Sequence, residues 1–359
     1  MDITHLLALS IKEGASDLHL SAGLPPILRI DGDLVRMDLP VLRPKQVDEL
    51  VHEVLNEAQI KALRDGVEID FSFEIPDVAR FRANVFKQNR GEAAVFRSIP
   101  SAIPTLDELG LGEIFKKLAL LPRGLVLITG PTGSGKSSTQ AAMVDYINKK
   151  RSYHILTIED PIEFVHESKK CLINQREVGR DTQRFSHALR SALREDPDVV
   201  VVGEMRDLET IRLALTAAET GHLVFATLHT TSAALTINRI IDVFPAEEKD
   251  MVRSMLSDSL QAVVTQTLLK KVGGGRIAAH EIMIGTPAVR NLIREDKVAQ
   301  IYSVIQTGSS LQMKTLDQSL STLVDEGVIT LETAREKAVS PKHISKDERN
   351  NYSLPEFSK

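Results

Sequence analysis

Residues 130–137 set the strongest limit on the fold and the chemistry of this chain. They fit the pattern G-x-x-x-x-G-K-[ST] at every fixed position. The apolar run Leu125–Thr129 just before them predicts a short buried strand, and the residues from Lys136 to about Asn148 predict a helix. A strand, a glycine-rich turn and a helix in this order predict a phosphate-binding loop rather than a turn without function.

The residue types of this loop suit a nucleoside triphosphate bound with Mg²⁺. Glycines let the backbone approach closely enough for several N–H groups to point at the β-phosphate. The N-terminus of the following helix adds partial positive charge at the same place. Lys136 is expected to reach the β- and γ-phosphates, and the hydroxyl of Ser137 to ligate Mg²⁺. The predicted ATP-binding residues are Gly130, Pro131, Thr132, Gly133, Ser134, Gly135, Lys136, Ser137 and Ser138.

Acidic residues follow two later predicted strands. After His154–Ile158 comes a loop with carboxylates that ends at Glu163, and Glu204 comes shortly after Val199–Val202. Ligands of open α/β sheets lie beyond the carboxyl ends of the strands, so we predict both acids near the phosphates. Glu163 is expected to hold Mg²⁺ through water or to align the attacking water, and Glu204 to polarise that water. The alternatives are a solvated acidic loop and an ion pair of Glu204 with Arg206.

Two histidines flank the predicted strand 223–227. His229 follows its end, where the phosphates are expected, and we predict a catalytic role for it. His222 precedes its start, at the opposite end of the sheet. We retain His222 as a candidate catalytic residue, with a subunit contact as the alternative.

The chain divides by pattern into an α+β part, an α/β core and a helical C-terminal region. Strand-like runs mixed with one or two helices occupy residues 1–100, and prolines at 100 and 104 mark a boundary. Apolar runs then alternate with helical segments over residues 101–286, which predicts a mostly parallel sheet. Residues 287–359 are expected to be helical, with a polar, frayed tail from about Ser340.

Composition excludes several other classes of function. A net charge of −5 gives no general attraction to nucleic acid. Cys171 is the only cysteine, so an internal disulfide and a thiolate zinc site are excluded, and a buried structural thiol is expected. The N-terminus lacks the pattern of a signal peptide, and the apolar runs are far shorter than the roughly 20 residues that cross a bilayer. We therefore expect a cytoplasmic protein with at most peripheral membrane association.

In their order along the chain, these motifs resemble those of the type II/IV secretion ATPase superfamily. The phosphate loop corresponds to its Walker A motif. The other matching segments are an acidic box, a Walker B motif containing Gly-Glu and a histidine box, at Thr157–Phe164, Asp196–Asp207 and Glu219–Thr231. Ala15–Leu20 also resembles part of the superfamily's N-terminal domain.

Within the superfamily, the chain is most similar to the type IV pilus retraction ATPases. Ala288–Glu295 resembles their AIRNLIRE signature, with Val289 in place of isoleucine. The spacing predicts an amphipathic helical turn with its apolar residues facing inward and with Arg290 and Arg294 on a shared outward face. A solvated basic edge of a helix is the alternative to a role in retraction.

The resemblance implies a homohexamer whose subunits have a PAS-like N-terminal domain and a RecA-like core. In such rings, arginines on the N-terminal strands reach a neighbour's nucleotide and stabilise charge on the transferring phosphoryl group. Arg82 and Arg97 match the family's positions best, and Arg80 and Arg90 are near enough to compete. Exposed surface arginines without this role are the alternative.

The function that the resemblance implies is hydrolysis of Mg-ATP by a hexameric motor that powers type IV pilus retraction and twitching motility. The motor would act at the cytoplasmic base of the pilus machine, peripheral to the inner membrane. Its implied partners are the inner-membrane pilus platform protein and a paralogous retraction ATPase, but not nucleic acid. The alternatives are a pilus-extension or type II secretion ATPase, the accessory retraction paralogue, and a non-hydrolysing nucleotide-switch scaffold. Extension motors typically carry a four-cysteine zinc element, which a chain with one cysteine cannot build.

Overall fold

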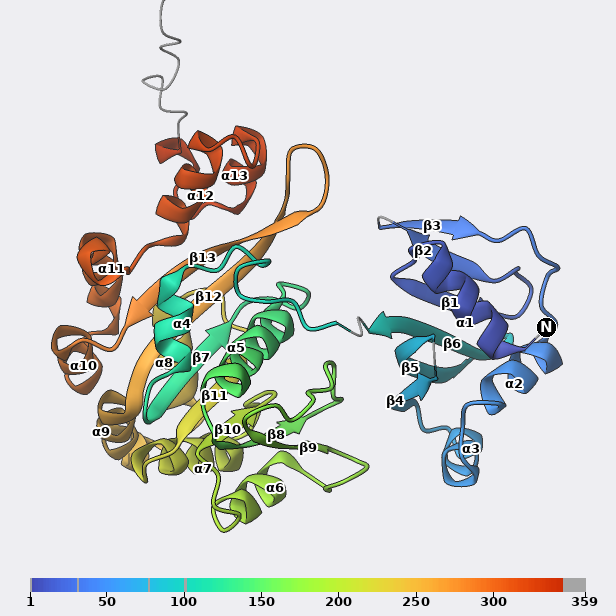
Figure 1. Ribbon diagram of the computed structural model, residues 1–359, viewed down its shortest axis with the longest axis horizontal. Helices are drawn as coiled ribbons and strands as arrows, with labels where there is room; N and C mark the ends of the chain where they lie inside the picture. The colour runs from blue at the N-terminus through green and yellow to red at the C-terminus, as the bar shows by residue number, and fades with distance from the viewer. Residues whose placement is uncertain (1, 31, 77, 100–101, 345–359) are drawn as a thin grey trace, which may run out of the picture. The chain divides into compact units, whose positions relative to one another are not determined.

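The computed structural model describes residues 2–30, 32–76, 78–99 and 102–344, which form two compact units (Figure 1). The first unit comprises Met1–Ala102 together with Pro161–Val165. The second unit comprises Ile103–Asp160 together with His166–Lys359. The phosphate loop and the segments that follow the predicted core strands belong mainly to the second unit.

The first unit is an antiparallel sheet with helices packed on one of its faces. Its strands follow the spatial order β3-β2-β1-β6-β5-β4. Side chains alternate between the two faces of a strand, and Leu18, Phe81 and Phe96 are buried in one cluster with the apolar sides of the helices. The elements are α1 (Ile3–Lys12), β1 (Asp17–Ser21), β2 (Ile27–Ile30), β3 (Asp33–Arg36), α2 (Pro44–His52), α3 (Glu57–Arg64), β4 (Ile69–Ile75), β5 (Ala79–Gln88) and β6 (Gly91–Ile99).

The second unit is built on a mostly parallel sheet with the order β13-β12-β7-β11-β10-β8-β9, in which β13 runs antiparallel to β12. In β10, Val199 and Val201 enter the core on one face, and Val200 and Val202 enter the core on the other. A sheet covered on both faces requires such unbroken apolar runs, and the predicted α/β fold class is confirmed. The strands are β7 (Gly124–Thr129), β8 (His154–Glu159), β9 (Leu172–Glu177), β10 (Val199–Val202), β11 (Leu223–Leu228), β12 (Leu260–Lys270) and β13 (Arg276–Ile284).

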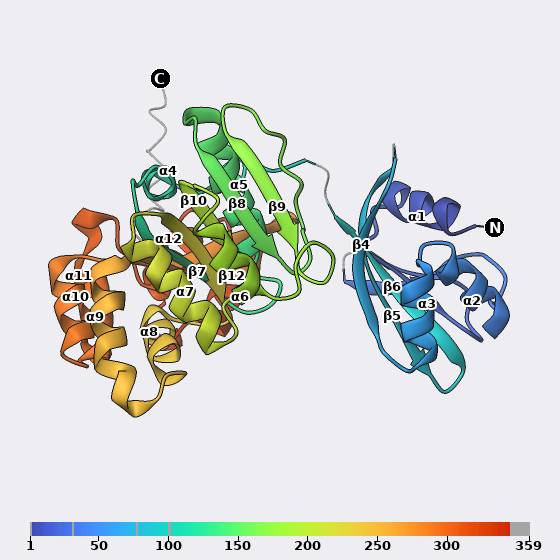
Figure 2. The ribbon, with the colours of Figure 1, turned by 90° about the horizontal axis from the view of Figure 1, so that it is seen from below.

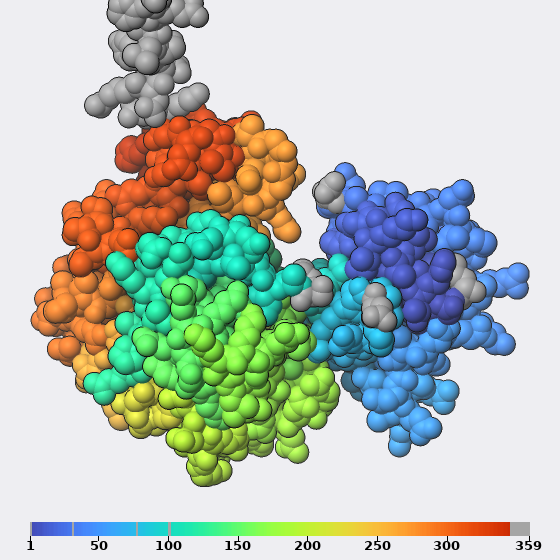
Figure 3. Space-filling model, in the orientation of Figure 1, coloured from blue at the N-terminus to red at the C-terminus, as the bar shows by residue number. Residues whose placement is uncertain are grey.

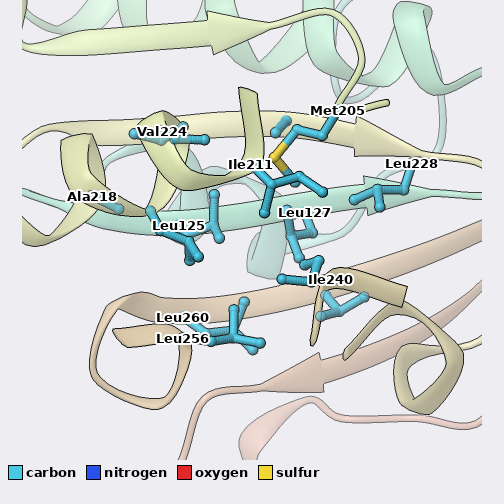
Figure 4. Close-up of a cluster of buried hydrophobic side chains, with 14 of the residues drawn as sticks. Leu125, Leu127, Met205, Ile211, Ala218, Val224, Leu228, Ile240, Leu256 and Leu260 are labelled. Carbon is cyan, nitrogen blue, oxygen red and sulfur yellow. The ribbon is translucent and has the colours of Figure 1, made fainter. Parts of the chain in front are cut away.

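Helices cover both faces of this sheet. α4 and α5 pack on one face and α6 to α9 on the other, where α7, α8 and α9 lie side by side (Figure 2). In the core beneath them, Leu125 and Leu127 of β7 lie with Ile211 of α7 and Ile240 of α8 (Figure 4). These helices are α4 (Glu113–Ala119), α5 (Lys136–Lys150), α6 (Phe185–Ala192), α7 (Leu208–Glu219), α8 (Ala233–Asp242) and α9 (Lys249–Ser259).

Of the C-terminal helices, α12 and α13 pack on the β12–β13 hairpin, α11 lies against α8 and β13, and α10 lies against α9. Leu320 and Val324 of α12 are buried with Leu269 of β12 and Ala279 of β13. The helices and the tip of the hairpin form one continuous surface (Figure 3). The helices are α10 (Pro287–Arg294), α11 (Ile301–Thr307), α12 (Leu316–Asp325) and α13 (Leu331–Lys337).

The end of the described chain is more ordered than the sequence predicts. Fraying is expected from about Ser340, but Ile344 is buried, and its carbonyl accepts hydrogen bonds from Nε and Nη2 of Arg335 at 3.2 and 3.1 Å. The prediction is therefore wrong for residues 340–344, because one apolar side chain anchors this polar stretch. Residues 345–359, where the rest of the predicted tail lies, are outside the described residues.

Cys171 is a buried thiol, as predicted. It is 3% exposed, and its Sγ lies 3.1 Å from the carbonyl oxygen of Arg151. Burial raises the pKa of the Cys171 thiol. Among the described helices, none combines the length and the apolar character needed to pass through a bilayer.

Candidate active site

The glycine-rich segment makes a tight turn between β7 and α5 and lies against β12. Gly130, Gly133 and Gly135 have φ angles of 141°, 77° and 86°, which favour glycine. A Cβ on Gly130 would lie 2.2 Å from the carbonyl oxygen of Gln266 and 2.7 Å from Oγ of Ser134. Position 130 therefore requires glycine, both for its backbone conformation and for the approach of the neighbouring strand.

The loop offers an ammonium and uncapped N–H groups at one place. Lys136 is 9% exposed, and its Nζ donates to the carbonyls of Gly130 and Pro131 at 2.9 and 3.1 Å. α5 begins at Lys136 without a side-chain cap, so its first N–H groups suit a phosphate. Ser137 and Ser138 are half-buried in the first turn. In loops of this kind, a Ser or Thr hydroxyl ligates the Mg²⁺ that is bound with the nucleotide. The hydroxyl of Ser137 suits that role.

Backbone hydrogen bonds bring the ends of neighbouring strands together beside the loop. The N–H of Gly130 donates to the carbonyl of Leu228, the last residue of β11, at 3.3 Å. Gly203, after β10, donates to the carbonyl of Ile158 in β8 at 2.7 Å. His229 directly follows β11 and Glu204 comes two residues after β10, so both lie at the edge of the sheet that carries the loop.

Glu204 bonds to two side chains at once. Its Oε2 lies 2.7 Å from Nη2 of Arg206, and its Oε1 lies 3.1 Å from Nε2 of His229. Burial raises the pKa of Glu204, but the hydrogen bond and charge of Arg206, with help from His229, outweigh burial and hold the pKa below its usual range. Glu204 is therefore ionised at neutral pH. The ion pair between Glu204 and Arg206, which was the alternative to a catalytic role, is present. His229 bonds to the same carboxylate.

The acidic loop after β8 is divided between the two units. The hydrogen bond to Glu204 is the main cause that raises the pKa of Arg206, and the charge of Asp160 raises it further. Asp160 therefore lies near Arg206 and Glu204. Glu163 belongs to the segment Pro161–Val165, which is part of the first unit. The catalytic role of Glu163 therefore stays a prediction.

His222 lies at the opposite edge of the sheet. Its Nδ1 lies 2.9 Å from the carbonyl oxygen of Ala217 in α7, and its own carbonyl accepts the N–H of Gly124 at 3.0 Å. Gly124 is the first residue of β7, whereas the phosphate loop follows the last one. The structure thus does not bring His222 to the loop of its own chain, and its bonds fit a structural role at the start of β11.

Arg82 and Arg97 are register partners on β5 and β6 of the first unit. Each has a carboxylate nearby: Asp70 lies 3.7 Å from Nε of Arg82, and Asp17 accepts from Nε of Arg97 at 2.8 Å. Asp17 is 4% exposed, so Arg97 neutralises a buried carboxylate, whereas Arg82 forms a more exposed pair. The in-trans role of either arginine stays a prediction.

Arg290 is not on the outward face that the sequence predicts. Its Nε donates to the carbonyl of Gly285 at 2.7 Å, and its Nη1 donates to the carbonyls of Ser257 and Asp258 at 2.8 and 2.5 Å. Ser257 and Asp258 lie in the final turn of α9, where the backbone carbonyls have no partner within the helix. The predicted shared face holds, because Nε of Arg294 also reaches Ser257 and donates to its Oγ at 2.9 Å. The predicted outward direction is wrong for Arg290, whose side chain turns back to cap the neighbouring helix.

Sequence reasoning missed two glutamines beside these groups. Nε2 of Gln175 in β9 donates to the carboxylate of Glu159 at 3.0 Å. Nε2 of Gln266 in β12 donates to the carbonyl of Ser134, inside the phosphate loop, at 2.6 Å. The signal in the sequence was an amide within a mostly apolar run, as in Ala262–Leu269. A polar side chain on a buried strand needs a hydrogen-bond partner, and the partner of Gln266 is the phosphate loop.

Known proteins are similar to this chain over most of its length. Residues 2–274 match the model of a family described as type II/IV secretion system protein. The chain is 70% identical over 344 residues to the type IV pilus retraction ATPase PilT of Pseudomonas aeruginosa, which covers 96% of this chain and 100% of that protein. It is 60% identical over 321 residues to a twitching motility protein of Neisseria gonorrhoeae, which covers 89% of this chain and 86% of that protein.

A solved structure of the pilus retraction motor PilT with bound ADP has a similar fold. The TM-score is 0.88 at 51% identity, and the match covers 95% of this chain and 98% of that chain. These matches confirm the predicted resemblance to the secretion ATPase superfamily and the predicted fold class. The chain therefore belongs to the type II/IV secretion system protein family.

Proposed function

We propose that this chain is a homohexameric motor that hydrolyses Mg-ATP at residues 130–138 and powers retraction of type IV pili. The predicted ATPase activity is confirmed by the 70% identity to a protein named as an ATPase. The observation that carries the proposed chemistry is the ionised carboxylate of Glu204, bonded to His229 at the strand ends that border the loop. Retraction is supported by the names of the relatives at 70% and 60% identity.

In the proposed mechanism, Glu204 activates the attacking water. Each of its oxygens has a lone pair left after the bond to Arg206 or His229, so a water can donate to the same carboxylate. As the oxygen of that water attacks the terminal phosphorus, its proton passes to Glu204 and the bond to the leaving diphosphate breaks. Arg206 and His229 fix the orientation of the carboxylate.

The phosphate loop supplies the positive charge that binds the phosphates. Nζ of Lys136 lies at the carbonyls of Gly130 and Pro131 and is within reach of a phosphate in the turn. The first N–H groups of α5 point at the same space and add the positive end of the helix dipole. Bound Mg²⁺, with Ser137 as a ligand, would neutralise charge on the β- and γ-phosphate oxygens.

We further propose that Arg82 acts on the nucleotide of a neighbouring subunit. Like charges directly opposite each other destabilise a sheet, and an anion from outside would relieve the repulsion between Arg82 and Arg97. Arg82 is preferred because Arg97 already neutralises Asp17. This arrangement makes hydrolysis depend on the ring.

The assignments that complete the motor are also proposals. Residues 1–100 form the PAS-like N-terminal domain, residues 101–286 the RecA-like core and residues 287–344 the described part of the C-terminal helical region. The ring docks on the inner-membrane pilus platform protein at the cytoplasmic base of the pilus machine, and it works with a paralogous retraction ATPase. The family resemblance and the names of the relatives support this setting.

Phosphate release from purified full-length protein tests the chemistry. Lys136→Ala and Glu204→Gln should lose at least about 100-fold in turnover while the protein still folds. Glu209→Gln is the matched control, because Glu209 is a half-buried residue of α7 that pairs with Arg190. Turnover like that of the wild type in Glu204→Gln would remove this residue from the mechanism.

Deletion of the gene with complementation tests the biological role. A retraction motor predicts an excess of unretracted filaments and loss of surface motility in the deletion strain. Loss of filaments would instead favour the pilus-extension alternative. Complementation with Glu204→Gln should fail to restore motility, whereas Glu209→Gln should restore it.

A further inference from the structure

A buried glutamine of β12 supports the phosphate loop from behind. Gln266 is 2% exposed, and its Nε2 donates to the carbonyl oxygen of Ser134 at 2.6 Å. The same Nε2 lies 2.9 Å from the position that a Cβ on Gly135 would take. The backbone carbonyl oxygen of Gln266 lies 2.2 Å from the corresponding position on Gly130. One residue outside the loop therefore contacts it near both ends of the glycine pattern.

Two neighbours fix which way the amide of Gln266 points. Oγ1 of Thr139 donates to Oε1 of Gln266 at 2.8 Å, and Nε2 of His280 lies 3.2 Å from the same oxygen. Burial lowers the pKa of His280 to about 3, so the ring is neutral, and a proton on Nε2 lets it donate to Oε1. Turning the amide over would bring Oε1 to the carbonyl oxygen of Ser134, where neither atom can donate.

The bond to Ser134 sets the direction of the next N–H group. In a trans peptide, the C=O and the following N–H point to opposite sides of the chain. The carbonyl of Ser134 is held toward β12, so the N–H of Gly135 points away from β12 and into the bend of the loop. Inward-pointing N–H groups of such loops are the groups that hold the β-phosphate.

We propose that Gln266, oriented by Thr139 and His280, is a positioning residue that holds the peptide between Ser134 and Gly135 in its phosphate-binding orientation. The inference rests on the proposed binding of ATP at this loop. ADP and ATP share the β-phosphate, so losing the bond weakens both nucleotides by the same factor. Equal losses distinguish positioning of the loop from an effect confined to hydrolysis, which would leave ADP affinity unchanged.

The test measures binding of fluorescent methylanthraniloyl-ADP and methylanthraniloyl-ATP to the full-length protein. Gln266→Met keeps the length of the side chain and removes the donor. We expect both nucleotides to bind about tenfold more weakly, because a buried carbonyl loses its partner and the peptide is free to turn. Gln300→Met, at an exposed glutamine, is the matched control and should bind like the wild type.

A second pair of variants keeps the test decisive if Gln266→Met does not fold. Thr139→Val removes the hydroxyl that orients the amide, and Thr139→Ser keeps it. Affinity should fall about threefold in the valine variant and return in the serine variant.

Two results would overturn the inference while leaving the proposed function intact. One is equal affinity of the Thr139→Val and Thr139→Ser variants. The other is binding by Gln266→Met within about twofold of the wild type. A wild-type protein that binds neither nucleotide would overturn both the inference and the proposed function.

Discussion

At the residue scale, the charges around Glu204 set the pH range in which it can accept a proton. Arg206 is the main cause of its lowered pKa, and burial alone would raise that pKa. A general base works when it is ionised, so activity is present above the pKa of Glu204 and is lost as pH falls through it. Arg206 therefore extends the active range toward acid.

Replacing Arg206 with glutamine is expected to raise the pKa of Glu204. The acid limb of the pH profile of kcat should then move to higher pH, and it is measured as phosphate release from about pH 3, below the usual range of a glutamate, up to about pH 8. Arg190→Gln removes the guanidinium of an exposed pair with Glu209 and serves as the control. An acid limb that stays in place in Arg206→Gln would contradict the assignment of Glu204 as the base.

At the element scale, Arg290 joins α10 to the end of α9. Its guanidinium reaches the carbonyls of Ser257 and Asp258 and the carbonyl of Gly285 before α10. Such a fork between separate acceptors depends on the planar guanidinium, because an ammonium is a point donor. The segment Ala288–Glu295 is thus tied to the end of α9, which runs directly into β12.

Arg290→Lys is expected to lower the free energy of unfolding by about 2 kcal/mol, because carbonyls at the end of α9 lose their partner. Urea denaturation of the purified protein measures the change. Arg239→Lys, at an exposed position of α8, is the control, and we expect a loss below about 0.5 kcal/mol. A loss in Arg290→Lys no larger than that of the control would show that the cap contributes little.

The elements also show how far the sequence alone could be interpreted. Val199–Val202 is both the predicted strand and the observed β10, because an unbroken run of β-branched residues suits a strand buried on both faces. β12 was not predicted: Leu260–Lys270 mixes apolar residues with Gln and Thr, and it follows α9 directly without glycine or proline. Its strand conformation comes from pairing with β7 and β13, which the local sequence does not encode.

The same limit explains which parts of the site were predictable. Glu204 and His229 could be located because each follows a strand whose end must reach the ligand-binding edge of the sheet. Gln266 lies far along the chain from Ser134, and the two meet only because β12 lies beside β7. The path of Arg290 back to α9 depends in the same way on how two helices pack. Spacing along one segment cannot predict such contacts.

At the scale of the whole molecule, the proposed ring makes each active site depend on two subunits. A subunit with Lys136→Ala lacks a working phosphate loop but keeps Arg82, and a subunit with Arg82→Ala keeps the loop but lacks the arginine. Each variant alone should have little turnover. Mixed rings should regain part of the wild-type rate, because some interfaces join an intact loop to an intact arginine.

Phosphate release after mixing and reassembly of the two variants measures this recovery. Mixing Lys136→Ala with Glu204→Gln is the control, since both changes damage the same half of the site. Recovery in the control mixture, or none in the test mixture, would count against an in-trans role for Arg82.

The single, shielded thiol of Cys171 makes motion in the assembly accessible to measurement. Thiol reagents act on the thiolate, and burial disfavours that form while also blocking access. A cysteine introduced at an exposed position of either unit would therefore react first and carry a fluorophore alone. Distances between dyes on neighbouring subunits could then be followed during turnover in a protein that keeps its native cysteine.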